Sequence, residues 1–246
     1  MSNFYLPHIG SRSNVEILYY IHSTFPTQSD SVFFGPDTYL YLDYLKATQP
    51  RFSESPKNII DICCGAGAGA IHLARQFRDA TVFGLDLNPR ALEFAAINAS
   101  HAGVSQIKFV ESNLFAELPK NVRGAVDIIV SNPPYIASAP EGEQGLATYA
   151  DGGANEGLEL ANKIIDDGFD LLTPGGLFVI YTGVTISVSK PSVDPFLDHL
   201  RARKDLEVLD YSILHPDMWS EEVGKGAYVN AARIQAIGTV VRKSRQ

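Results

Sequence analysis

Short β-rich runs alternate with helical patterns over the middle of this chain, and this alternation is the feature that most limits its fold. The strands are predicted over residues 58–62, 81–85, 106–111, 125–130 and 177–181. Helical patterns cover 36–46, 68–78, a segment that begins at Asn88-Pro89, and 158–172, where Pro174-Gly175-Gly176 is expected to end the helix. Strands separated by helices favour a mostly parallel sheet with helices on both faces.

The end of the chain departs from this alternation. Residues 206–214 and 233–241 are two β-rich runs without a good helical pattern between them, which predicts an antiparallel pair at the sheet edge. The predicted fold is therefore α/β and Rossmann-like, with a seven-stranded, mostly parallel sheet and an antiparallel edge strand. We place this single domain at 33–246, with a C-terminal β-hairpin at 206–241, after an N-terminal arm at 1–32.

The composition of the 246 residues is that of a globular protein, with 45% hydrophobic and 20% charged residues. The net charge of -8 argues against a general nucleic-acid binder, because such binding needs clustered Lys and Arg. The two cysteines, Cys63 and Cys64, are adjacent, and the six histidines lack metal-ligand spacing, so no metal site is expected. Without a signal peptide or a membrane-spanning run, the sequence predicts a soluble, cytoplasmic protein.

A glycine-rich loop follows the first predicted strand, in the sequence N-I-I-D-I-C-C-G-A-G-A-G-A of residues 58–70. Glycine suits such a turn because it takes positive φ and lets a ligand approach the backbone closely. Asp86 ends the second strand, 21 residues beyond Gly65 (86 minus 65), where a carboxylate can accept hydrogen bonds from both ribose hydroxyls of an adenosine. The loop therefore predicts a nucleotide-type cofactor.

Two cofactors compete for this loop. Gly65, Gly67 and Ala70 satisfy the dinucleotide pattern G-x-G-x-x-G/A, and Asp86 lies at the expected distance for NAD. Asp61 ends the first strand, where a carboxylate would face a pyrophosphate badly but would attract the sulfonium and ammonium of S-adenosylmethionine. Glycines that merely allow tight packing between strand and helix are the structural alternative.

The segment S-N-P-P-Y-I of residues 131–136 follows the fourth predicted strand, at the same edge of the sheet. Two prolines stiffen this turn, and the Asn132 side-chain oxygen and Pro133 carbonyl are two acceptors that suit a planar NH2 group. Tyr135 offers a ring face beside them. Such positioning would orient the nitrogen lone pair towards a methyl donor without a strong general base. A plain turn is the alternative.

Together with D-L-N-P at 86–89, these segments resemble the class I S-adenosylmethionine-dependent N-methyltransferases, and specifically the HemK-like branch that methylates glutamine amides in release factors. The sequence F-F-G-P-D-T-Y-L at 33–40 is similar to a P-x-D-T segment of that family. D-G-G followed by G-L-E within 151–159 resembles its G-G-x-x-G-L-E helix start. The resemblance covers about 33–181, and because glutamine, adenine and guanine methyltransferases share N-P-P-Y, it implies the reaction more strongly than the acceptor.

The resemblance implies roles for the matching residues. The cofactor side is expected to comprise Asp61, Cys63, Gly65, Gly67, Asp86, Leu87, Asn113, Leu114 and Asn132. The catalytic loop is expected to comprise Asn132, Pro133, Pro134 and Tyr135, and the substrate side Asp37, Thr38, Tyr135 and, from the connection between the last strands, Trp219. Cys63 departs from the family pattern because a first glycine is usual there, and Asn113 replaces an aspartate that would accept from the adenine amino group.

We therefore expect an S-adenosylmethionine-dependent N-methyltransferase whose acceptor is a protein glutamine amide. A small-molecule amine or amide is the first alternative acceptor, and adenine in nucleic acid is disfavoured by the acidic charge. An NAD-dependent oxidoreductase and a non-catalytic cofactor-binding module are the competing functional classes. Shorter family members typically work with a partner protein, so a partner subunit or a homodimer stays an open alternative. The glycine-rich residues 137–157 are either a substrate-gating lid or a plain surface loop.

Overall fold

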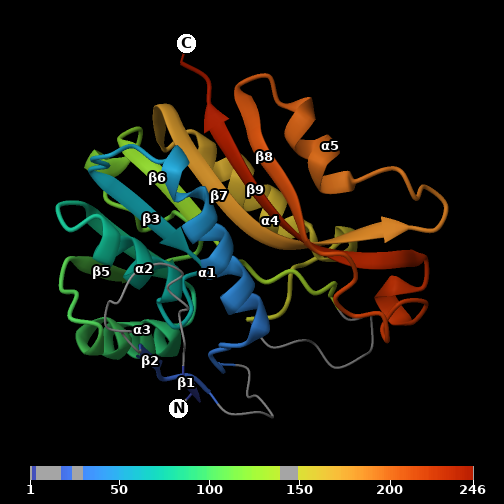
Figure 1. Cartoon of the computed structure of the whole chain (residues 1–246), viewed down its shortest axis with the longest axis horizontal. Helices are drawn as coiled ribbons and strands as arrows, with labels where there is room; N and C mark the ends of the chain where they lie inside the picture. Colours follow the sequence, from blue (N-terminus) through green and yellow to red (C-terminus); the bar gives the residue numbers. More distant parts are fainter. Residues whose placement is uncertain (1, 4–17, 24–29, 139–148, 246) are drawn as a thin grey trace, which may run out of the picture.

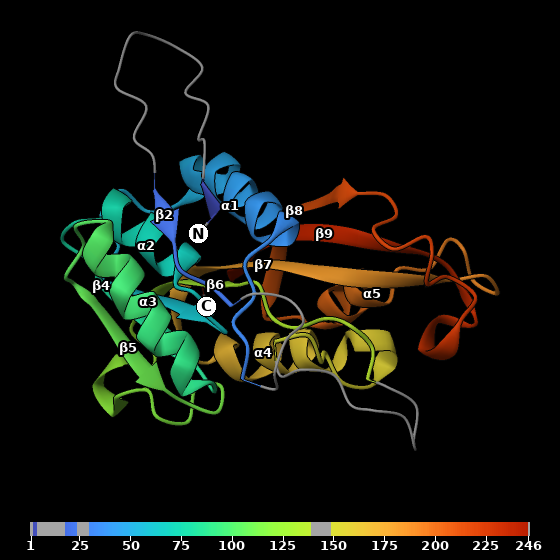
Figure 2. The same ribbon diagram turned by 90° about the horizontal axis from the view of Figure 1, so that it is seen from below.

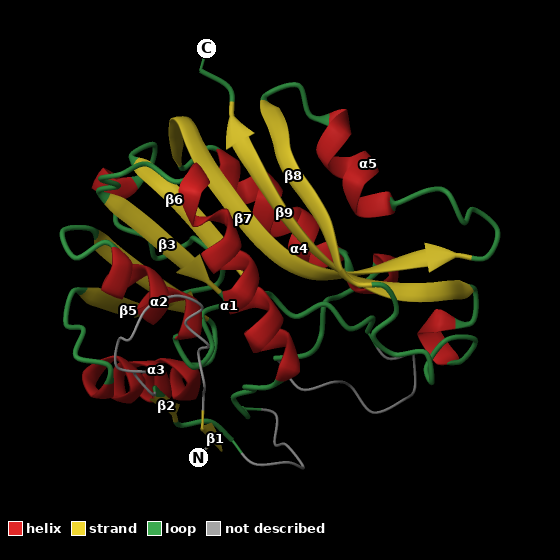
Figure 3. Cartoon of the chain, viewed as in Figure 1, coloured by secondary structure: helices red, strands yellow, loops and turns green. Residues whose placement is uncertain are grey.

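A seven-stranded sheet forms the centre of the molecule in the computed structural model, which describes residues 2–3, 18–23, 30–138 and 149–245 (Figures 1 and 3). The strand order is β5-β4-β3-β6-β7-β9-β8. The strands are β3 (Asn58–Ile62), β4 (Thr81–Asp86), β5 (Ile107–Glu111), β6 (Val126–Ser131), β7 (Leu172–Ser187), β8 (Leu206–His215) and β9 (Ala231–Lys243). From β5 to β7 the neighbours are parallel, and β9 is antiparallel to both β7 and β8. The predicted fold class is confirmed.

Helices cover both faces of this sheet, as Figure 2 shows with α1 and α2 above it and α4 and α5 below it. The helices are α1 (Pro36–Thr48), α2 (Ala68–Gln76), α3 (Pro89–His101), α4 (Glu159–Phe169) and α5 (Pro195–Ala202). The helices α1, α2 and α3 pack in one hydrophobic core, and α4 and α5 pack in a second. Consecutive strand residues feed the two cores, because Ile59 belongs to the first and Ile60 to the second.

Asparagine and aspartate caps set where two helices begin. The Asn88 side chain accepts from the Arg90 N–H (3.0 Å), with Pro89 in the first turn of α3 as predicted. The Asp194 side chain accepts from the N–H groups of Phe196 (3.1 Å) and Leu197 (2.9 Å) at the start of α5. The helix α5 was not predicted, although Asp194-Pro195 is the same kind of start signal as Asn88-Pro89.

The prediction for the segment around Pro174 was wrong. The helix predicted over 158–172 ends at Phe169, and Pro174-Gly175-Gly176 lies within β7 instead of ending the helix. The ladder pairs Val126 with Leu172 and then Ile128 with Leu177, so the Pro-Gly-Gly residues form an irregularity in the strand. The strand also continues beyond residue 181 to Ser187, because β9 pairs with it as far as Ala231.

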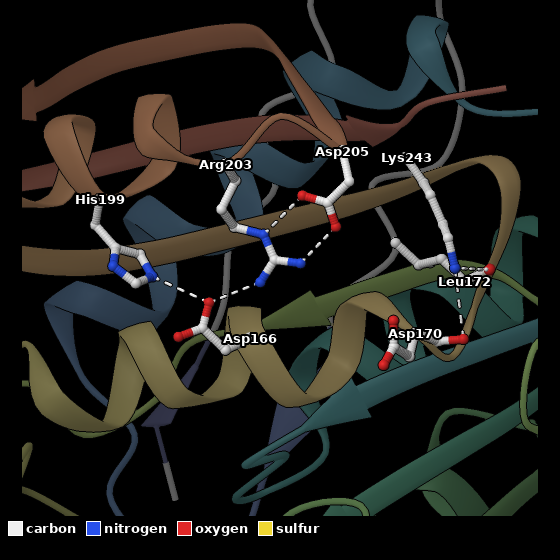
Figure 4. A network of polar contacts seen from close by, with 7 residues as sticks. All are labelled: Asp166, Asp170, Leu172, His199, Arg203, Asp205 and Lys243. Atoms are coloured by element: carbon white, nitrogen blue, oxygen red, sulfur yellow. Dashed lines mark hydrogen bonds and ion pairs between the residues drawn. The ribbon is translucent and has the colours of Figure 1, made fainter. Parts of the chain in front are cut away.

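A network of polar contacts holds α5 against α4 (Figure 4). The Arg203 guanidinium contacts Asp166 and Asp205, each at 2.7 Å, and lies 4.6 Å from the centre of the Phe169 ring. His199 contacts the same Asp166 carboxylate at 3.2 Å. Exposed ion pairs contribute at most about 1 kcal/mol each, so this network orients α5 more than it stabilises the fold.

The described part of the N-terminal arm lies against α3, and two short strands in it, β1 (Ser2–Asn3) and β2 (Tyr19–Tyr20), pair with each other. The Asn98 side chain, 1% exposed, bonds to both the N–H (2.7 Å) and the carbonyl (3.1 Å) of Ile21, and donates to the Ala66 carbonyl (2.9 Å). One buried asparagine thus joins the arm to the glycine-rich loop. Among the described residues, no helix has the length and apolar character to span a membrane.

Candidate functional site

A cavity of about 600 Å³ opens where the chain reverses its direction across the sheet. After β3 the chain proceeds outward to β4 and β5 and then returns to β6, on the other side of β3. The carboxyl ends of β3, β4 and β6 therefore flank one crevice, which is where open parallel sheets bind ligands. The ladder pairs Ile62 with both Leu85 and Ser131, so the three following loops start at one level.

Nearly all the predicted site residues come together on this cavity wall. The cavity is lined by Asp37, Thr38, Asp61, Cys63, Gly65, Asp86, Leu87, Asn113, Leu114, Asn132, Pro133, Pro134, Tyr135 and Trp219. Gly67 is the exception and does not line the cavity. It is the N-cap of α2, and a Cβ there would lie 2.9 Å from the Ala95 Cβ. Its role in the structure is close packing of α2 against α3.

The glycine-rich loop takes left-handed backbone conformations at three positions, Cys63 (φ 57°), Gly65 (φ 52°) and Gly67 (φ 83°). Cys63, the residue that replaces a glycine of the family pattern, is thus a non-glycine residue in a conformation that favours glycine. A Cβ at Gly65 would meet no atom within 4 Å. Since Gly65 lines the cavity, its missing side chain leaves room there for a ligand.

Asp86 ties this loop to the next strand. Its carboxylate accepts from the N–H groups of Gly65 (2.8 Å) and Asn88 (2.9 Å), while the Cys64 N–H donates to the Leu85 carbonyl (3.0 Å). Burial raises the pKa of Asp86, and the backbone hydrogen bonds partly offset that rise. A carboxylate has roughly four acceptor sites, and three backbone N–H groups (Gly65, Asn88 and Leu87) donate to Asp86, so acceptor capacity remains for a ligand hydroxyl.

Asp61 lies at the base of the cavity and is 2% exposed. Its carboxylate accepts from the Ala70 N–H (2.7 Å) and the Tyr41 hydroxyl (3.3 Å). Burial raises the pKa of Asp61 to about 7, although both hydrogen bonds oppose the rise and nearby Asp86 adds to it. Tyr41 was not predicted as a site residue. Its spacing could have indicated it, because Tyr41 follows Asp37 by four residues and therefore lies on the same face of the helix.

The charges on the cavity wall favour a cationic ligand. The charged residues among the described lining residues are Asp37, Asp61 and Asp86, with one histidine, His215, and without any Lys or Arg. Such a wall repels a pyrophosphate and attracts a sulfonium or an ammonium. These residues therefore fit S-adenosylmethionine better than NAD, and the described residues contain no group of three His, Cys, Asp or Glu that could hold a metal ion.

Two further residues of the predicted cofactor side lie after β5. Asn113 is exposed and lines the cavity, so its amide is accessible to a ligand. Leu114 follows with φ 50°, and the Ser112 hydroxyl donates to its carbonyl at 2.7 Å, which fixes this turn. Leu87, 55% exposed, lines the same cavity from the loop after β4. Leu87 thus contributes apolar surface to the cavity wall.

The catalytic loop predicted at 132–135 leaves β6 directly beside the glycine-rich loop. The Ser131 hydroxyl donates to the Ile62 carbonyl at 2.8 Å, which joins the ends of β6 and β3. Within the described part of the chain, neither the Asn132 side-chain amide nor the Pro133 carbonyl takes part in a side-chain or turn hydrogen bond. Two acceptor oxygens without a hydrogen-bond partner among the described residues thus belong to cavity-lining residues.

Tyr135, the last residue of this loop, is 7% exposed and surrounded by other aromatic rings. Its ring stacks on Trp219 at 5.5 Å between centroids and meets Tyr181 edge-on at 5.9 Å. The ring that we expected to present a face to the acceptor is thus covered on one side by Trp219. Tyr181 was not predicted as a site residue because it matches the apolar pattern of a buried strand.

The segment 149–157 packs tightly against the catalytic loop. A Cβ at Gly157 would overlap the Tyr135 carbonyl oxygen, and a Cβ at Gly152 would lie 2.5 Å from the Tyr135 Cα. The Ser138 hydroxyl donates to the Asp151 carboxylate at 2.6 Å. Of the expected lid or loop at 137–157, residues 139–148 lie outside the described residues, and both described ends are fixed beside Tyr135.

The connection between β8 and β9 contributes Met218 and Trp219 to the cavity wall, beside the predicted catalytic loop. The Ala137 N–H donates to the Tyr228 hydroxyl (2.9 Å), and the Met218 N–H donates to the Ile234 carbonyl (2.7 Å). Tyr228 was not predicted as a site residue, since nothing in its local sequence indicates that its hydroxyl meets a loop about ninety residues earlier.

The adjacent thiols are not suited to nucleophilic chemistry. Both Cys63 and Cys64 are free, and burial together with the carboxylates of Asp86 and Asp61 raises the pKa of each thiol well above its usual value. Since the thiolate is the nucleophile, a protonated thiol is unreactive. The cavity instead offers carboxylates, an amide and backbone carbonyls, which bind and orient ligands.

Comparison with known proteins points to one family. A family model described as "Methyltransferase domain" matches residues 53–223. The chain is 33% identical over 148 residues to the release factor glutamine methyltransferase of Deinococcus radiodurans, covering 57% of this chain and 50% of that protein. It is 30% identical over 139 residues to the ribosomal protein uL3 glutamine methyltransferase of Neisseria gonorrhoeae, covering 54% of this chain and 45% of that protein. The chain thus spans half or less of the length of these relatives.

A solved structure shares the fold. The crystal structure of TrmN from Thermus thermophilus is similar with a TM-score of 0.54 and 19% sequence identity, and the match covers 84% of this chain and 48% of that one. A likeness at this identity supports the architecture alone.

Proposed function

This chain belongs to the family of methyltransferase domains, and from that membership we propose that it methylates the side-chain amide nitrogen of a glutamine residue in a protein. The enzyme is an S-adenosylmethionine-dependent methyltransferase. When bound, the cofactor supplies a methyl group attached to a positively charged sulfur. The Asp61 carboxylate would attract that cation and the Asp86 carboxylate would accept from the ribose hydroxyls, while the absence of a side chain at Gly65 would leave room for the ligand.

The observation that carries the proposal is the pair of free acceptors at Asn132 and Pro133. A glutamine amide presents a planar NH2 group whose two hydrogens need acceptors in a dehydrated site. The Asn132 Oδ1 and the Pro133 carbonyl are two such acceptors, on adjacent residues held by a rigid Pro-Pro pair. The same two oxygens would stabilise the positive charge that develops on the nitrogen as it loses its resonance.

The residues of the chain account for catalysis by positioning. An amide is a poor nucleophile, so the gain comes from holding its nitrogen in line with the methyl group and away from water. The cofactor would supply the methyl group when bound, and the Asn132 and Pro133 oxygens would hold the amide nitrogen, which would afterwards lose one of its two protons to solvent. Tyr135 is not the base in this scheme, because burial and the Asp37 carboxylate raise the pKa of its phenol well above the usual value.

The named activities of the two relatives support a protein acceptor. One is named for glutamine methylation of a release factor and the other for glutamine methylation of ribosomal protein uL3. Both named acceptors, the release factor and ribosomal protein uL3, are polypeptides. The net charge of -8 of this chain also favours a protein acceptor over nucleic acid.

A labelling experiment tests this function. The protein is incubated with methyl-labelled S-adenosylmethionine and, separately, a release factor, ribosomal protein uL3, bulk tRNA and a metabolite extract. We expect label in one protein acceptor, lost when its target glutamine is replaced by glutamate. Asn132→Ala should reduce the rate at least about 100-fold, as expected for loss of a preorganised hydrogen bond at a reacting group. The exposed Asn121→Ala is the matched control and should keep the parent rate.

Two results would contradict the proposal. Label in tRNA or in a metabolite but in neither protein would assign another acceptor to the same loop. A parent-like rate for Asn132→Ala would remove the residue from the catalytic role altogether.

A further inference from the structure

The Tyr135 phenol makes its hydrogen bond with a residue of another segment. Its hydroxyl donates to the Asp37 carboxylate at 2.6 Å, a short distance typical of charge-assisted hydrogen bonds. Asp37 lies in the first turn of α1, after Pro36, and lines the same cavity. The N-terminal turn of a helix favours a negative charge, so the carboxylate is held where it can accept this bond.

The Tyr135 ring is fixed on its other sides as well. Trp219 stacks on it with an interplanar angle of 15°, and Tyr181 meets it at 65°. A Cβ at Gly183 would overlap the ring at Cδ2, so the strand β7 passes directly against it. Trp219, Tyr181 and Gly183 thus contact the ring, and the bond to Asp37 holds its hydroxyl end.

We propose that Asp37 is a positioning residue, which fixes Tyr135 and through the Pro133-Pro134 pair holds the Asn132 and Pro133 oxygens in their catalytic geometry. The inference rests on the proposed role of Asn132 and Pro133 in holding the acceptor. Proline locks φ, so a displacement of Tyr135 passes along the loop instead of being absorbed by it. A misplacement of about 1 Å at a reacting group lowers a rate by about 100-fold.

Four variants separate positioning from direct contact with the acceptor. Tyr135→Phe removes the donor but keeps the ring, Asp37→Ala removes the acceptor, and the double variant removes both. Asp37→Asn keeps an oxygen that accepts the phenol hydrogen. Asp43→Ala, an exposed aspartate on the same helix, is the matched control.

The kinetic result follows from the two partners acting as one unit. Tyr135→Phe and Asp37→Ala should each lower kcat by about 10- to 100-fold, while the acceptor KM stays within about twofold. The double variant should be no slower than the slower single variant, because both remove the same bond. Asp37→Asn should restore most of kcat. A raised acceptor KM for Asp37→Ala, undiminished in the Tyr135→Phe background, would show that Asp37 contacts the acceptor itself and would overturn the proposal.

Trp219 gives a readout that needs neither cofactor nor acceptor. It is the single tryptophan of the chain and it stacks on Tyr135. Its fluorescence should shift, and its quenching by acrylamide should rise, in Tyr135→Phe and Asp37→Ala but not in Asp37→Asn or Asp43→Ala. Unchanged fluorescence in the first two, with cofactor binding retained as evidence of folding, would contradict the inference. If the parent protein fails to methylate any protein acceptor, the proposed function fails while this fluorescence test of the Asp37–Tyr135 bond still stands.

Discussion

The predicted cofactor side of the cavity, around the loop after β3 and Asp86, and the predicted acceptor side, around Tyr135, are built in different ways. On the predicted cofactor side, two N–H groups of the loop after β3 donate to β4: that of Cys64 to the Leu85 carbonyl and that of Gly65 to the Asp86 carboxylate, all within one strand–helix–strand unit. On the predicted acceptor side, side chains from three other segments contact Tyr135: Asp37 of α1, Tyr181 of β7 and Trp219 of the β8–β9 connection. Backbone contacts tolerate many side-chain changes, whereas side-chain contacts do not. The acceptor side is therefore where substitutions would alter substrate choice without loss of cofactor binding.

Gly157→Ala tests this separation with the largest expected effect. Gly157 has φ 91°, and a Cβ there would overlap the Tyr135 carbonyl, so both backbone strain and overpacking oppose the methyl group. Together they should lower the free energy of unfolding by about 4 kcal/mol and displace the catalytic loop. Methyl transfer should fall below detection, while the folded fraction still binds S-adenosylmethionine with an affinity within about threefold of the parent.

The control for this prediction is Gly224→Ala, which has the same kind of backbone conformation (φ 82°) but open space within 4 Å. Backbone strain alone should lower its free energy of unfolding by about 1–2 kcal/mol, and its methyl-transfer activity should be unchanged. Thermal unfolding, calorimetric cofactor binding and the labelling assay measure the three quantities. If Gly157→Ala lost cofactor affinity as strongly as methyl transfer, the two sides would not be separable.

This difference also explains what could be predicted from the sequence. The strand, the glycines and Asp86 of the cofactor side follow one another in the chain, so local propensity and spacing were sufficient to place them. Tyr181 and Tyr228 belong to the site through the register of β7 and the path of the β8–β9 connection. The Tyr181 ring and the Tyr228 hydroxyl meet partners that are distant in sequence, and no local pattern indicates such contacts.

Partners distant in sequence also explain the errors in the predicted bounds of β7. The strand β7 is longer than predicted because its partner β9 pairs with it to Ser187, and Leu177–Tyr181 alone carry the local signal. Pro174 is accommodated by an irregular register with β6, which local propensity does not reveal. In contrast, α5 has a local signal at Asp194-Pro195, and it could have been predicted.

Asp61→Asn tests whether the cofactor side is held under electrostatic strain. The pKa of Asp61 rises to about 7 in the folded state, so the folded protein binds a proton more tightly than the unfolded chain does. The free energy of unfolding of the cofactor-free protein should therefore fall as pH rises from about 4 to about 7, by on the order of 3 kcal/mol. Asparagine removes this dependence, since its amide does not titrate, while its oxygen still accepts from the Ala70 N–H.

At pH 8 the Asp61→Asn variant should thus have a higher Tm than the parent without cofactor, and bind S-adenosylmethionine at least about tenfold more weakly, which is about 1.4 kcal/mol. Binding of the cation by the parent should release a proton near pH 6, measurable as a buffer-dependent heat. A parent Tm that stays flat between pH 4 and pH 8 would contradict the raised pKa. Asp127→Asn, remote from the cavity, controls for loss of one charge.

Gly65→Ala tests the predicted cofactor side. In contrast to Gly157→Ala, it should weaken cofactor binding and cost little stability. A Cβ at Gly65 meets no protein atom, so the stability cost is limited to strain of about 1 kcal/mol. The alanine side chain would project into the space that we assign to the cofactor and should weaken cofactor binding about tenfold. Gly103→Ala, with φ 68° and equally open space away from the cavity, should show the strain without the change in affinity. Equal affinities for the two variants would place the ligand elsewhere.

Cys63→Gly has the smallest expected effect and concerns the residue by which this loop departs from the family pattern. Its φ of 57° costs a non-glycine residue about 1–2 kcal/mol, and glycine removes that strain at an entropy cost of about 0.5–1 kcal/mol. The net expectation is a gain of about 0.5 kcal/mol in the free energy of unfolding, with cofactor affinity unchanged. Cys64 is buried and is not among the residues with positive φ, so Cys64→Gly should instead destabilise the protein. Denaturant unfolding gives the free energy of unfolding of both variants. If Cys63→Gly were destabilised, the contacts of the Cys63 side chain would stabilise the protein by more than its backbone strain costs.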